Sequence, residues 1–115
     1  MKFLLIEYEE FKKLDIRVGL IKSCEYVLKS NKLYKLLVDC GEKKLRQIIT
    51  GVSQYYKKED LLGIKIVVIV NLKPKIILGE LSEGMLLAAD FNGEPFLLMV
   101  DERNKKNVPP GSKVK

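Results

Sequence analysis

The sequence contains no histidine. Histidine is the commonest metal ligand and general base in proteins, and it activates the serine or cysteine of most nucleophile pairs. Its absence removes these classes of catalytic and metal site. Lysine or carboxylate catalysis stays chemically available, but the sequence shows no carboxylate pair, phosphate-binding glycine loop or metal-ligand spacing. The sequence therefore predicts a binding protein, not an enzyme, and one without a cofactor.

Cysteine is also scarce, with Cys24 and Cys40 as the two examples. Each cysteine lies in an apolar, strand-like segment, and neither has the close Cys/His spacing of a metal site. We expect reduced, half-buried thiols in a reducing cytosol. A disulfide between the two is the alternative hypothesis.

Long apolar runs and polar low-complexity tracts are missing. Runs such as Ile66 to Val70 are far too short to cross a bilayer, and acidic residues follow "MKFLLI" before a signal-like segment develops. A chain of 115 residues can build one core but leaves little material for a second. We therefore expect a single domain over residues 1–115, located in the cytoplasm and not in a membrane.

Positive charge is in excess, with 21 Lys+Arg against 15 Asp+Glu and a net charge of +6. Such an excess favours a polyanionic partner. The cations that gather in or beside the predicted strand connections are Lys29, Lys32, Lys35, Lys43, Lys44, Arg46, Lys73 and Lys75. If they converge on one flank, they form a groove that neutralises several phosphates. The alternative is that they only keep turns and edges soluble.

Hydrophobic patterning predicts mainly strands. Segments with the length and composition of strands cover 15–26, 33–40, 45–50, 65–70 and 85–89, with a further apolar strand over 96–100. Gly19 marks a bend or a bulge in the first strand. Helical spacing predicts a short helix within residues 7–14 and one turn over 57–62. This inventory is typical of a small all-β Greek-key barrel, although an open five-stranded sheet fits the periodicity nearly as well.

The stretch "NLKPKIILGELSEGMLLAAD", residues 71–90, suggests a contact loop. Ser82 lies between two glycines, so its hydroxyl and nearby backbone N–H groups have room to approach a sugar or phosphate. Met85 supplies an apolar surface for a base, or it faces the core as the first residue of a strand. The tyrosines at 26, 34, 55 and 56 leave the same choice between stacking on bases and packing the barrel end.

The order of several motifs resembles a known family. The succession "FKKLDIRVGLI", "SNKLYKLLVDCG", "RQIITGVSQYY" and "LLGIKIVVIVNLKPKIILGELSEGMLLAAD" is similar to the tRNA-binding domain of free-standing tRNA-binding proteins and of many bacterial methionyl-tRNA synthetases. The resemblance covers about residues 11–90, and "VPPGSKV" near the end resembles the family's C-terminal strand. It implies an OB-fold, five-stranded Greek-key barrel over 11–90 and a C-terminal β extension over 91–115 that forms a dimer contact.

The resemblance also implies a function, which is non-catalytic binding to the outer corner of the L-shaped tRNA by a homodimer. The family's tRNA-contacting positions fall on Asn31, Lys32, Arg46, Ser82 and Met85. We add Lys73 and Lys75 from their charge and their placement on either side of Pro74, which stiffens the chain after a buried strand.

Two other functions stay open. The chain is alternatively a trans-acting tRNA-binding subunit, or a docking adaptor, of a methionyl-tRNA synthetase. An OB-fold that binds single-stranded nucleic acid is a weaker alternative, because the grooves of such proteins usually carry exposed aromatic stacking platforms.

Overall fold

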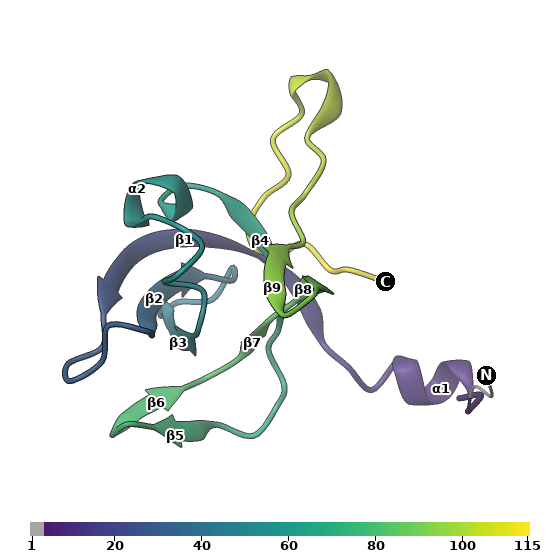
Figure 1. Ribbon diagram of the computed structural model, residues 1–115. Helices are drawn as coiled ribbons and strands as arrows, with labels where there is room; N and C mark the ends of the chain where they lie inside the picture. The colour runs from purple at the N-terminus through teal and green to yellow at the C-terminus, as the bar shows by residue number, and fades with distance from the viewer. Residues whose placement is uncertain (1–3) are drawn as a thin grey trace.

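An antiparallel five-stranded sheet, curled into a nearly closed barrel, forms the body of the protein (Figure 1). The structure is a computed structural model that describes residues 4–115. The sheet has the strand order β3-β2-β1-β4-β7. Its strands are β1 (Ile16–Tyr26), β2 (Tyr34–Asp39), β3 (Arg46–Thr50), β4 (Lys65–Ile69) and β7 (Met85–Leu86). This arrangement confirms the predicted all-β barrel with an OB-like fold.

The barrel interior follows from the two-residue period of its strands. Along β2 the side chains of Tyr34, Leu36 and Val38 are buried, and the residues between them are half-buried. Ile66 and Val68 of β4 fill the same core. These strands thereby line the interior with apolar side chains and leave their alternate side chains for the outer face.

Gly19 is a close-packing position. A Cβ atom there would lie 2.6 Å from Cγ1 of Val38 and 3.0 Å from Cγ2 of Val68. The irregular pairing of β1 falls instead between Ile21 and Ser23, so the bulge that we considered at Gly19 lies elsewhere. Near this position β1 changes its pairing partner from β4 to β2. A side chain at residue 19 would push Val38 and Val68 away, so a glycine is needed.

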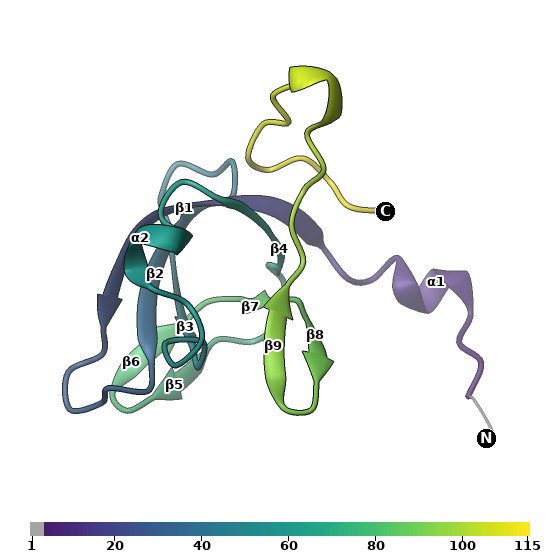
Figure 2. The same cartoon turned by 45° about the horizontal axis from the view of Figure 1, so that its top comes forward.

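Two short helices lie within the predicted spans. The helix α2 (Lys58–Leu61) covers one end of the barrel and buries Leu61. The helix α1 (Tyr8–Phe11) buries no residue and projects from the barrel (Figure 2). Within residues 4–115, no helix is both long enough and apolar enough to span a membrane.

A second hairpin replaces the loop that we expected after β4. Strands β5 (Lys75–Ile77) and β6 (Glu80–Ser82) pair with each other across a two-residue turn. Leu78 and Gly79 form this turn with φ values of 48° and 79°. Hairpin turns of this kind favour Asn-Gly or Asp-Gly, so the sequence Leu-Gly gave only a weak signal.

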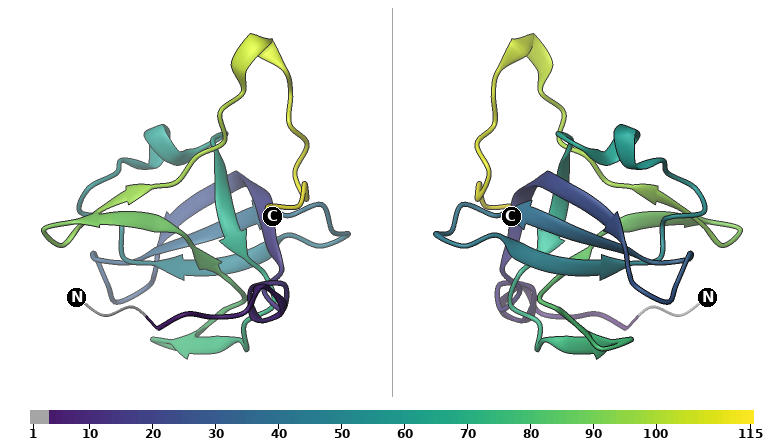
Figure 3. Two further views of the ribbon diagram at one scale, coloured as in Figure 1. Left: turned by 90° about the vertical axis from the view of Figure 1, so that its right-hand side faces the viewer. Right: turned by 90° about the vertical axis from the view of Figure 1, so that its left-hand side faces the viewer.

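The predicted strand at 85–89 is divided in two. Strand β7 ends at Leu86, and β8 (Ala88–Phe91) begins a separate hairpin with β9 (Glu94–Leu97). Met99 then bridges to Ile66 of β4, so the segment predicted as a strand over 96–100 is mostly this return along the barrel. After β9 the chain forms a protruding loop with a 3-10 turn, η1 (Arg103–Lys105) (Figure 3).

The end of the chain pairs with the free edge of β1. The backbone N–H of Val18 donates to the carbonyl of Ser112 at 2.9 Å, and that of Val114 donates to Ile16 at 2.8 Å. The motif "VPPGSKV" therefore does form a strand-like segment, as the resemblance implied. It satisfies backbone groups that an edge strand would leave exposed.

Gly111 lets this C-terminal segment touch the turn between β2 and β3. A Cβ atom on Gly111 would lie 2.8 Å from the carbonyl oxygen of Cys40 and 2.9 Å from Cα of Gly41. Gly111 also has a φ of +89°, which only glycine adopts readily. The backbone contact therefore has no room for any side chain.

We predict that Gly111→Ala lowers the free energy of unfolding by more than Gly93→Ala does. Gly93 has a similar φ of +85°, but a Cβ atom there meets nothing within 4 Å. Gly93→Ala therefore carries only the backbone strain, whereas Gly111→Ala carries the strain and the steric clash. Strain alone costs about 1–2 kcal/mol. Urea unfolding of both variants measures the difference, and equal losses would show that the contact between Gly111 and Gly41 adds no stability.

Candidate functional site

A cavity of about 290 Å³ lies beside the β5–β6 hairpin and brings together several predicted site residues. The predicted residues that line this hairpin cavity are Lys73, Lys75, Ser82 and Met85. Met85 is 46% exposed, so the alternative that it faces the core is wrong. Both lysines are exposed, and within residues 4–115 neither forms an ion pair. The hairpin cavity thus combines two available cations with an apolar surface.

Ser82 has a structural position at the inner wall of this cavity. Its side chain is buried, and its Oγ accepts a hydrogen bond from the backbone N–H of Ile49 at 3.0 Å. The same hydroxyl donates to the carbonyl of Gly84 at 3.4 Å. We expected this hydroxyl to face a phosphate or ribose, but it instead satisfies a backbone group on the edge of β3.

These bonds belong to a seam that closes the barrel between β3 and β6. The N–H of Glu83 donates to the carbonyl of Gln47 at 2.8 Å, and the Gln47 amide donates to the carbonyl of Leu81 at 2.9 Å. We call this set of contacts, together with Ser82 to Ile49, the closing seam. Because β3 and β7 are the edges of the five-stranded sheet, the closing seam joins β3 to the segment that leads into β7, through one backbone bond and two side-chain bonds where ladder bonds are missing.

Arg46 reinforces the closing seam from the start of β3. Its Nη1 donates to the carbonyl of Glu83 at 2.7 Å, while Nε and Nη2 donate to the Glu42 carboxylate at 2.6 and 3.0 Å. The guanidinium holds the pKa of Glu42 below its ordinary value through these bonds. The side chain of Arg46 is therefore already engaged inside the protein.

Arg46 lines a second cavity of about 290 Å³, which shares no lining residue with the hairpin cavity. Arg17, which sequence analysis did not single out, also lines it and pairs with Asp15 through Nε at 2.5 Å. This bond to Arg17 lowers the pKa of Asp15. Each arginine thus has its own carboxylate, so the second cavity offers an anion less uncompensated charge than the two lysines do.

Asn31 and Lys32 lie in the connection between β1 and β2, and both are exposed. The carbonyl of Asn31 accepts a hydrogen bond from Oγ of Ser53 at 3.1 Å, which ties the connection to the segment after β3. Figures 1 and 2 show the β1–β2 connection and the tip of the β5–β6 hairpin at the same end of the barrel. The ion pair of Lys35 on β2 with Glu80 on β6, at 3.2 Å, links the two elements.

The structure therefore brings most predicted site residues toward one end of the barrel. Arg46 is the exception, because β2 and β3 pair Tyr34 with Thr50 at this end and Val38 with Arg46 at the other. At the usual rise per strand residue, Arg46 lies about 13 Å along β3 from Thr50. Arg46 contributes to this surface mainly by fixing the turn at Glu83.

Neither cysteine takes part in a surface site. Cys24 and Cys40 are both free, so the alternative of a disulfide between them is wrong, and both are buried where we expected half-buried thiols. Burial raises the pKa of each to about 11. Both remain protonated near neutral pH and are therefore poor nucleophiles.

We predict that Ser82→Ala destabilises the protein by about 1–3 kcal/mol, because it leaves the buried N–H of Ile49 without an acceptor. Ser112→Ala is the matched control, since its hydroxyl donates to the exposed carbonyl of Pro109, which water can also satisfy. Urea unfolding of the two variants compares them directly. A loss for Ser82→Ala no greater than that for Ser112→Ala would contradict the closing role of Ser82.

Solved structures share this arrangement of elements over nearly the whole chain. The MetRS-related protein from Pyrococcus horikoshii is 38% identical, with a TM-score of 0.87 over 98% of this chain and 100% of that one. The chaperone CsaA from Bacillus anthracis is 29% identical, with a TM-score of 0.84 over 97% of this chain and 100% of that one. The barrel, the C-terminal hairpin and the returning tail are thus found together in other proteins.

Sequence comparison agrees with the structural likeness. The methionine–tRNA ligase of Methanocaldococcus jannaschii is 50% identical over 111 residues, which are 96% of this chain and 16% of the ligase. This chain therefore spans only a small part of that curated relative. The family model described as "Putative tRNA binding domain" matches residues 16–113. The chain belongs to this tRNA-binding domain family.

Proposed function

We propose that this chain is a non-catalytic tRNA-binding protein that recognises the outer corner of the tRNA L-shape. The binding surface consists of the β1–β2 connection and the β5–β6 hairpin with its cavity. Asn31 and Lys32 contribute from the connection. Lys75 contributes from the first position of β5, and Lys73 contributes from the segment just before β5. Because tRNA functions in translation, the protein acts in the cytoplasm under this proposal.

The observation that carries this proposal is the pair of lysines without ion-pair partners on the rim of the hairpin cavity. Lys35, on the neighbouring strand β2, is in contrast paired with Glu80. Lys73 and Lys75 instead present their charges beside the half-exposed side chain of Met85. Cations attract the phosphates of any RNA, while a methionine surface adapts to sugar or base faces.

Ser82 and Arg46 support binding indirectly in this proposal. Ser82 and Arg46 fix the segment 82–84 against β3, and this segment leads directly into Met85. A rigid surface binds a folded RNA more tightly because less conformational freedom is lost on association. Both residues are therefore positioning residues for the RNA surface.

We predict that the protein retards tRNA in gel-shift experiments at micromolar concentration and low salt, with little preference among tRNAs of different amino-acid identity. Replacing both Lys73 and Lys75 with Gln removes two phosphate contacts, so the salt dependence of log K falls by about two units. Lys105→Gln with Lys106→Gln is the matched control, because these lysines lie in the protruding loop around η1, away from the hairpin (Figure 1).

This proposal is wrong if folded wild-type protein leaves tRNA free in low salt. The proposed position of the RNA surface is wrong if the Lys105 and Lys106 substitutions weaken binding as much as the Lys73 and Lys75 substitutions do. Both comparisons use tRNA mixtures at a fixed protein concentration, so that only charge position differs between the variants.

The proposed tRNA-binding unit is a homodimer built through the C-terminal hairpin. Phe91, Phe96 and Met99 are 65%, 44% and 55% exposed, an unusual amount of apolar surface for one small hairpin and its exit. The N-terminal Leu4 and Leu5 are almost fully exposed as well. Figure 1 shows α1 projecting from the barrel on the side opposite the β1–β2 connection, with the β8–β9 hairpin between the two. Dimerisation there leaves both RNA surfaces accessible.

We predict a solution mass of twice 13.2 kDa by light scattering. Phe91→Lys with Met99→Lys introduces charges into the proposed contact and shifts the mass toward the monomer. Leu78→Lys is the control, because Leu78 is 62% exposed at the tip of the β5–β6 hairpin, outside the proposed contact. A monomeric wild-type protein, or a dimer unaffected by the Phe91 and Met99 changes, would contradict this contact.

A second candidate function is a trans-acting tRNA-binding subunit for a methionyl-tRNA synthetase. The observation that favours it is that matching sequence occurs as a 16% portion of a methionine–tRNA ligase. A separate chain with the same surface would supply tRNA affinity to a ligase that lacks this portion. The exposed apolar hairpin would then contact the synthetase in place of a second copy.

A further inference from the structure

A cavity of about 470 Å³ lies at the end of the barrel covered by α2. Its volume falls within the usual range for small-ligand sites. Tyrosines from three segments line it, namely Tyr26 at the end of β1, Tyr34 at the start of β2, and Tyr55 and Tyr56 before α2. We call it the tyrosine cavity. None of the predicted tRNA-contacting residues lines it.

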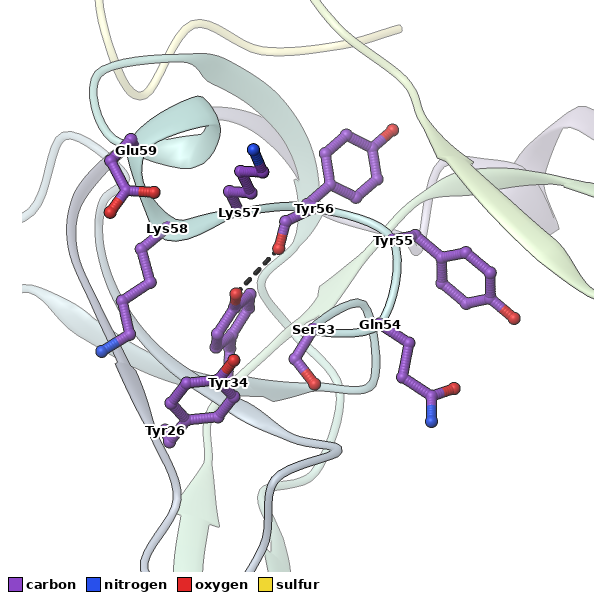
Figure 4. A pocket seen from close by; sticks show the side chains of 9 residues that line it. All are labelled: Tyr26, Tyr34, Ser53, Gln54, Tyr55, Tyr56, Lys57, Lys58 and Glu59. Carbon is purple, nitrogen blue, oxygen red and sulfur yellow. Dashed lines mark hydrogen bonds between the residues drawn. The ribbon is translucent and has the colours of Figure 1, made fainter.

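Two of these tyrosines hold the cavity in shape. The Tyr34 hydroxyl donates to the carbonyl of Tyr56 at 2.7 Å, as the dashed line in Figure 4 shows. Burial raises the pKa of Tyr34 to about 12, so its hydroxyl stays protonated and keeps donating. The Tyr56 hydroxyl accepts the backbone N–H of Leu97 at 3.1 Å. Tyr34 and Tyr56 therefore have structural roles in this cavity.

Tyr26 has a different environment. The residue is 46% exposed, and the centroid of its ring lies 5.1 Å from that of the Tyr34 ring at a tilt of 49°. The ammonium group of Lys58 lies over the Tyr26 ring, 4.9 Å from its centroid. Figure 4 shows Tyr26, Tyr34 and Lys58 on one side of the cavity, with Ser53 and Gln54 on the other. A half-exposed tyrosine ring under a mobile ammonium group suits a base and its phosphate, because the flexible lysine side chain can move from the ring to the phosphate when the base stacks.

The tyrosine cavity also adjoins the proposed RNA surface. Ser53, which lines the cavity, donates its hydroxyl to the carbonyl of Asn31 in the β1–β2 connection. Tyr26 and Tyr34 lie at the two ends of that connection, directly across from each other in the strand register. A phosphate held near Lys32 is therefore close to the cavity along the same RNA strand.

We propose that the tyrosine cavity takes one unpaired nucleotide of the bound RNA, with its base stacked on Tyr26 and its phosphate beside Lys58. The inference rests on the proposed tRNA binding and adds an aromatic contact to a surface that otherwise recognises shape and backbone. Ser53 and Gln54 offer hydrogen-bonding groups at the edge of the base. Stacking itself tolerates every base, so the cavity selects for an unpaired nucleotide and not for a sequence.

The test compares two RNAs at one salt concentration, tRNA and a blunt RNA duplex of equal charge that has no unpaired nucleotide. Tyr26→Leu keeps apolar cover over Tyr34 but removes the aromatic face. We expect this variant to bind tRNA about five- to 100-fold more weakly and to bind the duplex as the wild type does. Tyr26→Phe retains the wild-type affinity for both, and Lys58→Met lowers the salt slope for tRNA by about one.

Tyr8→Leu is the matched control. Tyr8 is an exposed tyrosine on α1 with the ammonium group of Lys12 over its ring at 5.4 Å, and it lies away from the tyrosine cavity. This variant should bind both RNAs like the wild type. Circular dichroism melting shows whether each variant is folded.

A folded Tyr26→Leu variant with unchanged tRNA affinity would overturn the inference and leave the cavity to another ligand class, such as a peptide. Equal losses for tRNA and duplex would also overturn it, because the aromatic face would then have no selective role. Cross-linking of the wild-type protein to tRNA containing 4-thiouridine is the second measurement. It should label the peptide that contains Tyr26, and labelling confined to other peptides would contradict the site. A wild-type protein that binds no tRNA at all overturns the proposed function instead.

Discussion

Closure of the barrel at the edge of β3 is the constraint on which the rest of the structure depends. The strands β3 and β7 end the sheet without pairing through a full ladder, and Ser82 fills the gap by accepting the N–H of Ile49. Arg46 and Gln47 add bonds to the same segment. These contacts fix the end of the β5–β6 hairpin, and the hairpin in turn sets where Lys73, Lys75 and Met85 lie. Serine at position 82 thus shapes the proposed RNA surface while its own hydroxyl stays inside.

The C-terminal tail provides a second closure, because it pairs with the free edge of β1. It reaches this edge because Gly111 and Gly41 allow two backbones to touch. The tail leaves the β8–β9 hairpin and α1 projecting with apolar side chains that the barrel does not cover. The described residues therefore carry two distinct surfaces, a cationic end where we propose that RNA binds and an apolar side where we propose that a second copy binds. In our proposal, the tyrosine cavity adds a place where the cationic end holds a base.

The sequence predicted the barrel well because its strands carry strong, local signals. The branched run of β4 and the alternation of β2 place side chains on known faces without any knowledge of the partners. The β5–β6 hairpin was missed because Leu78-Gly79 is an unusual turn pair, and the true end of β7 was missed because apolar sequence continues past Leu86. For the site, charge and resemblance identified the exposed lysines. The internal roles of Ser82 and Arg46 depend on partners distant in sequence, such as Ile49 and Glu83, which no local pattern reveals.

Above all, we propose that folded RNA binds at the barrel end formed by the β1–β2 connection and the β5–β6 hairpin. Nuclear magnetic resonance of the ¹⁵N-labelled full chain, titrated with tRNA, tests this claim most directly because it reports on every backbone amide at once. We expect the amide shifts to concentrate in the residues around Asn31 and Lys32 and from Lys73 to Met85. Shifts confined to α1 and the β8–β9 hairpin, with the barrel end unchanged, would contradict it.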